Sequence, residues 1–295
     1  MSQYAKRRLS LAGIDLARYT RTELRALVRQ VLEARIHGLA FSAYVEGQGP
    51  GTVIGESQIR ERLAPIQAHT RWIRTFSCTD GHELIPRIAK EAGLQTVVGA
   101  WLDEDLEHNE LELAGAIEVA RAGHADIVAV GNEVLLREEL SEDQLIDYLQ
   151  RVEAAVPGAV VGYVDAYYLF EEHPRVAAAV DVILANCYPF WEACPAEHAL
   201  LYMKEMYRRA QRAGGGRKVI ISETGWPDRG SPYGGAMPSE HNAIRYFLDT
   251  ARWAEEEGIE FFWFSSHDEA WKVAAEGDVG AFWGLWDADG RPKYA

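Results

Sequence analysis

The sequence predicts a single (β/α)8 barrel, an α/β fold in which eight parallel strands alternate with helices. Short apolar runs, rich in β-branched and aromatic residues, alternate with longer amphipathic segments from one end of the chain to the other. The alternation occurs eight times without a break in composition, which favours one domain over several. The length of 295 residues is slightly above that of a typical barrel of this kind.

The eight expected strands are short, and several are nearly continuous hydrophobic runs. Such runs are typical of parallel strands that are buried on both faces. The expected strands cover residues 37–44, 71–77, 95–101, 126–131, 159–164, 181–186, 218–222 and 260–265.

Helical patterns separate these strands. Ser141, with Gln144 three residues later, is a typical helix start, and Gly93 and Gly123 stand where helices commonly end. The segment after the fifth strand, 171–179, predicts only a short helix because it contains a proline. The clearer helices are expected at 57–69, 81–92, 107–122, 141–155, 195–213 and 239–257.

The chain divides into an N-terminal helical extension, residues 1–35, and a catalytic barrel, residues 36–295. A helix at 22–35 is expected to cover the N-terminal end of the barrel. The first residues are basic but lack the apolar stretch of a signal peptide, and no apolar run is long enough to span a membrane. As written, the sequence predicts a cytoplasmic protein, or else a domain excised from a larger membrane-bound or secreted protein.

Charge and cysteine content exclude several classes of function. The formal net charge of −15 disfavours nucleic acid as a partner, and we expect no membrane insertion by this chain. A neutral sugar chain is compatible with such a surface. The odd count of three cysteines does not indicate a disulfide framework, although Cys187 and Cys194 could pair in an exported protein.

Two glutamates follow or end predicted strands on the side where barrel enzymes place their active sites. Asn132 and Glu133 end the fourth strand run, and Glu223 ends the seventh. Two carboxylates across one site are what a glycosidase needs, and about 5–5.5 Å between them indicates a retaining mechanism. The alternative is that each glutamate forms a structural ion pair at the barrel rim.

Several segments resemble glycoside hydrolase family 17. VIISETGWP, around Glu223, resembles the segment of its nucleophile, and VGNEVL, around Glu133, resembles that of its acid/base. YPFW, DEAWK and WGLWDADGRPKY resemble later segments of the family in the same order and spacing. The resemblance covers nearly the whole chain. It implies a (β/α)8 fold and a retaining mechanism without cofactor, as in the bacterial β-1,3-glucanases and β-1,3-glucanosyltransferases of this family.

The resemblance also implies roles for individual residues. Glu133 corresponds to the acid/base and Glu223 to the nucleophile. Asn132 corresponds to a residue that binds the 2-hydroxyl group of the sugar, an interaction that can strengthen in the transition state. Tyr188 corresponds to a residue whose hydroxyl holds the nucleophile in place.

A further charged pair and one departure from the family also follow from the resemblance. Glu269 and Lys272 correspond to an auxiliary ion pair beside the acid/base. Many members carry another glutamate three residues before the aromatic residue of the closing segment. That position is Gly280 here, with Asp278 nearby, so the charged network around the acid/base is expected to differ.

Aromatic residues near strand ends are candidates for stacking on sugar rings. Trp191, Trp226 and Trp271 all follow strand ends, and the alternative for each is packing in the barrel rim. Tyr44 and Arg74, near the ends of the first two strands, are further cleft candidates. For Arg74 the alternative is that it pairs, buried, with a catalytic carboxylate.

The sequence contains no HExxH motif or other metal-ligand spacing, so we expect no metal. The favoured function is therefore a retaining enzyme that cleaves or rearranges β-1,3-glucan oligosaccharides, as glucanosyltransferase or endo-β-1,3-glucanase. One alternative is a retaining barrel glycosidase of other β-glucan or mannan specificity. Another is a glycan-binding barrel that has lost catalysis. The sequence gives no indication of oligomeric state.

Overall fold

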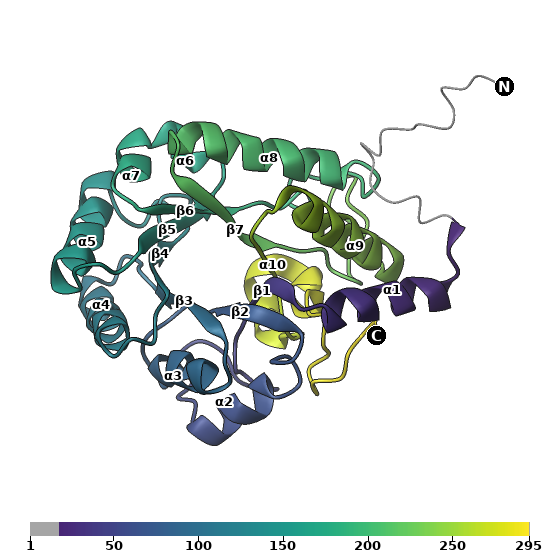
Figure 1. The fold of residues 1–295 in the computed structure, drawn as a ribbon, viewed down its shortest axis with the longest axis horizontal. Coiled ribbons are helices and arrows are strands. Elements are labelled where there is room, and N and C mark those ends of the chain that lie inside the picture. The colour runs from purple at the N-terminus through teal and green to yellow at the C-terminus, as the bar shows by residue number, and fades with distance from the viewer. Residues whose placement is uncertain (1–17, 295) are drawn as a thin grey trace.

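The computed structural model describes residues 18–294 and contains a closed barrel of eight parallel strands (Figure 1). Each strand pairs with its sequence neighbours, and β1 closes the barrel on β8. This confirms the (β/α)8 prediction, and each of the eight predicted runs overlaps one strand. The strands are β1 (Ile36–Ala40), β2 (Thr70–Arg74), β3 (Gln95–Ala100), β4 (Ile127–Asn132), β5 (Val161–Ala166), β6 (Val182–Asn186), β7 (Lys218–Thr224) and β8 (Phe261–Trp263).

The barrel interior is a packed apolar core. Eight buried residues fill it, and Trp72 packs against them. The ring of Phe262 occupies the space that a side chain at Gly38 would need, since a Cβ there would lie 2.3 Å from the ring. The eight are Val97, Ile127, Ala129, Val164, Val182, Leu184, Ile220 and Phe262.

Side chains alternate between the two faces of a strand, so the inward row of the barrel continues along each strand. Trp72 of β2 is followed two residues later by Arg74, and Leu184 of β6 by Asn186. The inward row therefore changes from apolar to polar at the C-terminal ends of the strands, which places these polar side chains above the core.

Helices surround the strands, as Figure 1 shows. Ser141 forms the predicted capping box with Gln144 at the start of α5. The helix expected at 57–69 is shorter than predicted, because it ends at Leu63 and gives way to turns. The clearer helices are α2 (Glu56–Leu63), α3 (Ile85–Glu91), α4 (Leu106–Arg121), α5 (Glu142–Ala155), α8 (Ala199–Gly214) and α9 (Glu240–Glu257).

The connection between β5 and β6 holds two short helices instead of the single short helix expected at 171–179. They are α6 (Leu169–Glu172) and α7 (Pro174–Ala178). Pro174 lacks a backbone N–H and therefore fits the first turn of a new helix better than the interior of a longer one.

The helix α1 (Arg21–Glu33) runs parallel to α9. At its start, Arg21 and Arg25 both bind Glu240, the first residue of α9. Its other end lies beside the end of α9 and the start of β1. The helix therefore lies next to α9, with its C-terminal half beside the N-terminal ends of β1 and β8. That it covers the end of the barrel stays a prediction. Residues 1–17 of the predicted extension lie outside the described residues.

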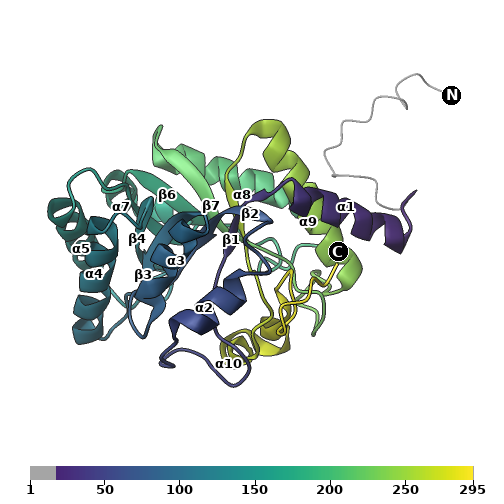
Figure 2. The ribbon, with the colours of Figure 1, turned by 60° about the horizontal axis from the view of Figure 1, so that its bottom comes forward.

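After β8 the chain forms short helices at the C-terminal end of the barrel: η4 (Ala270–Lys272), α10 (Val273–Glu276) and η5 (Gly277–Phe282). Figure 2 shows α10 and α2 at the same end of the molecule. Trp271 lies against Tyr44, which follows β1, with ring centroids 5.9 Å apart.

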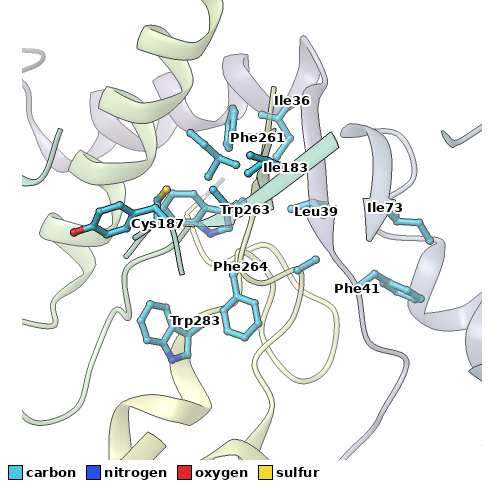
Figure 3. Close-up of a cluster of buried hydrophobic side chains, with 14 of the residues drawn as sticks. Ile36, Leu39, Phe41, Ile73, Ile183, Cys187, Phe261, Trp263, Phe264 and Trp283 are labelled. Atoms are coloured by element: carbon cyan, nitrogen blue, oxygen red, sulfur yellow. The ribbon is translucent and has the colours of Figure 1, made fainter. Parts of the chain in front are cut away.

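The larger hydrophobic core lies between the strands and the helices. Figure 3 shows a part of it, from Ile36 and Phe261 at the starts of β1 and β8 to Phe264 and Trp283 beyond the end of β8. All three cysteines are free and buried. Within residues 18–294, no helix is long and apolar enough to cross a membrane.

Candidate active site

Five polar side chains meet at the C-terminal end of the barrel. Arg74, Asn132 and Asn186 are the last residues of β2, β4 and β6, Glu133 follows β4 directly, and Glu223 is the last residue but one of β7. The pairing of β6 with β7 shifts register so that Asn186 lies opposite Glu223. Such irregularities are common next to active sites, where they redirect a side chain.

Both carboxylate oxygens of Glu223 are held by donors. Nη1 of Arg74 lies 2.5 Å from Oε1, and the hydroxyl of Tyr188 donates to Oε2 over 2.6 Å. Nη2 of Arg74 also donates to Oδ1 of Asn132 over 2.5 Å. Because Arg74 is fully buried, it acts as the charged partner of Glu223, the alternative that the sequence left open for it, and does not line the cleft.

Glu133 is held differently. Its φ of +52° lies in the left-handed region, which costs a residue with a side chain about 1–3 kcal/mol and recurs at active sites. Its N–H donates to the carbonyl of Val164 over 2.8 Å. Nδ2 of Asn186 donates to Oε1 over 2.8 Å, while Oδ1 of Asn186 accepts from the Ser222 hydroxyl. Asn186 thus links the acid to β7.

The surroundings of Glu133 raise its pKa to about 7. Burial is the largest cause, because it disfavours the charged form, and the negative charge of Glu223 adds to it. Asp165 acts in the same direction, whereas the hydrogen bond from Asn186 and the charge of Arg137 oppose the shift. Glu133 therefore keeps its proton at pH values at which an exposed glutamate has lost it.

The predicted pair of Glu269 and Lys272 forms a buried ion pair, with 2.5 Å between Nζ and Oε2. Burial opposes the ionisation of Glu269, but Lys272 and the indole N–H of Trp271 hold its pKa below the usual value. Nζ of Lys272 also lies 4.1 Å from the ring centre of Phe264, over its face. The pair thus joins the segment after β8 to the side chains around the cavity.

A cavity of about 340 Å³ opens among these side chains. Of the predicted site residues, it is lined by Glu133, Glu223, Tyr188 and Trp191. Its remaining walls are Leu136, Ala166, Tyr167, Tyr168, Asn186, Glu192, Phe264 and Glu276. Two carboxyl groups in different environments thus face one space that is walled by aromatic rings.

The structural features match those of known carbohydrate-active enzymes. A sequence profile of the BtgE/BtgC glycoside hydrolase domain matches residues 38–284. A family 17 β-1,3-glucanosyltransferase from Rhizomucor miehei superposes with a TM-score of 0.78 at 25% identity, covering 88% of this chain and 96% of that one. The chain belongs to glycoside hydrolase family 17.

A curated relative agrees with this assignment, and a more distant structure shares only the fold. A glucan 1,3-β-glucosidase of Candida albicans is 27% identical over 289 residues, covering 89% of this chain and 93% of that protein. An endo-laminarinase from Formosa Hel1_33_131 shares the fold, with a TM-score of 0.72 at 17% identity, over 90% of this chain and 86% of that one.

One predicted sugar-binding residue of this family 17 chain is placed elsewhere. Trp226 is 1% exposed and does not line the cavity. Its indole N–H donates to the carbonyl of Met237 over 3.1 Å, and its ring packs edge-on against Phe190. The prediction for Trp226 was wrong because its side chain turns into the core, where both its ring and its N–H have partners.

Tyr44 and Trp271 lie against each other beyond the ends of β1 and β8 and do not line this cavity. Trp271 is about one-third exposed, with its ring available on the surface. A role for these two rings in binding the more distant units of a sugar chain stays a prediction.

Sequence reasoning missed Asn186 and Glu276. Asn186 had a signal, since it is a polar residue at the end of a hydrophobic strand run, as Asn132 is. Glu276 had none, because it lies in a short helix outside any motif. Among residues 18–294, no group of three or more His, Cys, Asp or Glu side chains is placed to hold a metal ion.

Proposed function

We propose that this chain is a retaining enzyme acting on β-1,3-glucan, as glucanosyltransferase or endo-β-1,3-glucanase, with Glu223 as nucleophile and Glu133 as acid/base. One observation carries the proposal. The two carboxyl groups face one cavity, with Glu223 bound to a buried arginine and Glu133 protonated up to a pH of about 7. An acid and a nucleophile separated in this way are what double displacement requires.

In the first step, Glu223 attacks the anomeric carbon while Glu133 gives its proton to the glycosidic oxygen. The bond to the leaving sugar breaks, and an ester forms between the sugar and Glu223. In the second step, Glu133, now ionised, removes a proton from the acceptor hydroxyl, which attacks the anomeric carbon and releases Glu223. Water as the acceptor gives hydrolysis, and a sugar hydroxyl gives transfer.

The neighbours of the two glutamates have supporting roles in this scheme. Arg74 and Tyr188 fix the orientation of the attacking carboxylate. This lowers the entropic cost of reaching the geometry in which it attacks. Asn132 uses its carbonyl oxygen to bind Arg74, which leaves its amide nitrogen for the 2-hydroxyl group of the sugar.

The choice of β-1,3-glucan rests on the names of similar proteins, which include glucan 1,3-β-glucosidases and a β-1,3-glucanosyltransferase. The aromatic walls Trp191 and Phe264 and the net charge of −15 fit a neutral sugar chain. We favour transfer over hydrolysis, because aromatic rings that line the cavity, such as Trp191, can stack on a sugar acceptor and retain it against water.

The test is to incubate the protein, and its Glu223→Ala variant, with a β-1,3-linked glucose hexasaccharide and to follow the products by mass spectrometry. Products longer than six units with the wild type alone would establish transfer. Shorter products alone would establish hydrolysis. No reaction with either protein would contradict the assignment to β-1,3-glucan and favour another glycosidase specificity.

A further inference from the structure

Two further carboxyl groups, those of Glu192 and Glu276, line the cavity beside the two catalytic ones. Glu192 accepts a hydrogen bond from the Tyr167 hydroxyl, whereas Glu276 lies next to the nucleophile. Glu276 is the last residue of α10, and it shares the cavity wall with Glu133 and Glu223. The double displacement described above uses only two carboxyl groups, so Glu276 has no part in it. Its presence in an otherwise aromatic part of the wall therefore needs an explanation.

The side chain of Glu276 is incompletely paired. Its Oε2 is buried without a well-formed hydrogen bond, and so is Nε1 of the neighbouring Trp283. Burial and the charge of Glu223 raise the pKa of Glu276 to about 7, while the charge of Lys272 and the nearby Trp283 indole oppose the shift. A buried polar atom left without a partner destabilises the fold, so a further donor, such as a sugar hydroxyl, would stabilise this carboxylate oxygen.

Gly280 shows why this carboxylate comes from position 276. A Cβ atom at Gly280 would lie 3.0 Å from Cβ of Glu276 and 2.8 Å from the carbonyl carbon and oxygen of Lys272. A side chain at position 280 would therefore clash with the backbone of Lys272 and crowd the side chain of Glu276. The closing segment of this chain thus carries glycine at position 280 and a carboxylate close by at position 276, at the end of the preceding helix.

We propose that Glu276 is a substrate-binding residue that accepts a hydrogen bond from a hydroxyl group of the sugar unit held at Glu223, in place of a side chain at position 280. This inference rests on the proposed function. Glu276 is not a second acid/base, because Asn186 holds Glu133 at the cavity wall for that role, whereas Glu276 lies beside Lys272 and the nucleophile.

The experiment compares Glu276→Ala and Glu276→Gln with the wild type on the β-1,3-linked hexasaccharide and on a dinitrophenyl β-laminaribioside, whose leaving group needs no proton. Loss of a hydrogen bond to a charged group is expected to lower kcat/KM by about 10–100-fold for Glu276→Ala. The loss should be similar on both substrates, and added azide should not restore the rate. Glu133→Ala should instead retain more activity on the aryl substrate and respond to azide.

Asp278→Asn is the matched control. Asp278 lies two residues further along the chain, is exposed and binds Ser231, so its change should leave kcat/KM unaltered. Glu276→Gln separates function from folding. It keeps the shape of the side chain and removes a buried charge, so it should fold at least as stably as the wild type at pH 8 and still lose activity.

Deoxy sugars identify the bound hydroxyl. A donor that lacks the hydroxyl held by Glu276 should have a lower kcat/KM than the parent donor with the wild type. With the Glu276→Ala variant, the two donors should have nearly the same kcat/KM. Wild-type kinetics for both Glu276 variants would overturn this inference and leave the proposed function standing. Azide rescue of Glu276→Ala would make it the acid/base and overturn it too. A wild type inactive on both substrates would mean that the proposed function has failed first.

Discussion

Single residues decide how the two catalytic carboxyl groups differ. Glu133 and Glu223 are the same amino acid at the ends of two strands of one barrel, and only their neighbours distinguish them. Arg74 and Tyr188 bind the two carboxylate oxygens of Glu223. Burial and the negative charge of Glu223 raise the pKa of Glu133. In the proposed mechanism, the side chains around the two glutamates thus favour the proton on Glu133, which is the proposed acid.

The pH dependence of catalysis follows from the pKa of Glu133. We expect kcat/KM to fall as the pH rises through about 7, because Glu133 then loses the proton that it must donate. Initial rates on the hexasaccharide between pH 4 and pH 9 measure this. The Glu276→Gln variant should keep the same descending limb at a lower rate. A limb that disappears in that variant would assign the titration to Glu276.

The raised pKa of Glu133 should also make the stability of the fold depend on pH. Folding raises the pKa of Glu133, so the protonated form stabilises the fold, and this contribution is lost as the pH rises through about 7. Glu133→Gln should therefore raise the free energy of unfolding at pH 8 by about 1–3 kcal/mol and change it little at pH 4. Urea denaturation at the two pH values checks this, and an equal effect at both would contradict the assigned ionisation.

Two tryptophans that both follow predicted strand ends should behave differently. Trp191→Ala should raise KM for the hexasaccharide several-fold, because its ring lines the cavity. Trp226→Ala should instead lower the free energy of unfolding by about 3–5 kcal/mol, because its ring is buried in the core. Kinetics and urea denaturation of both variants separate the two roles. A Trp226 variant with normal stability and a raised KM would restore the original prediction.

Glu133, Glu223 and Arg74 could be predicted because each stands at or near the end of a hydrophobic strand run, whereas Tyr188 was predicted from the resemblance to family 17. The sequence could not tell which way Trp226 turns, since a residue beyond a strand end has no periodicity to fix its direction. It also could not find Glu276, whose position depends on how the chain folds back after β8.

The strands and helices explain why the site lies where it does. Strand positions were predictable from the hydrophobic runs, because buried parallel strands have few polar residues along their length. The exact ends of the strands were not predictable. The positions of Glu133 and Glu223 depend on register shifts in the β4–β5 and β6–β7 pairs. Such irregularities leave no clear trace in composition.

The helix α1 should be part of the cooperative barrel. Leu32 is buried at its C-terminal end, so Leu32→Ala should lower the free energy of unfolding by about 2–5 kcal/mol in a single transition. Arg29→Ala, an exposed change on the same helix, should have little effect. Urea denaturation measures both. A separate early transition for Leu32→Ala would show that the helix is an independent extension, as the division at residue 35 first suggested.

At the scale of the whole molecule, the two ends of the barrel differ in function. A cavity of about 620 Å³ lies between α1 and α9 at the N-terminal ends of the strands, far from Glu133 and Glu223. The smaller cavity at the C-terminal ends contains the two carboxyl groups that we propose as catalytic. This division is general for barrel enzymes, in which loops at the C-terminal end carry the site and the rest of the barrel carries the stability.

The central claim is that Glu223 forms a covalent bond with the sugar. The most direct measurement is to incubate the protein with a 2-deoxy-2-fluoro β-laminaribiosyl fluoride, digest it and locate the added mass by mass spectrometry of the peptides. The fluorine atom slows both steps, while the fluoride leaving group needs no proton, so the ester accumulates. We predict an adduct on Glu223. An adduct on Glu133 or Glu276, or turnover of the reagent without any adduct, would contradict the assignment.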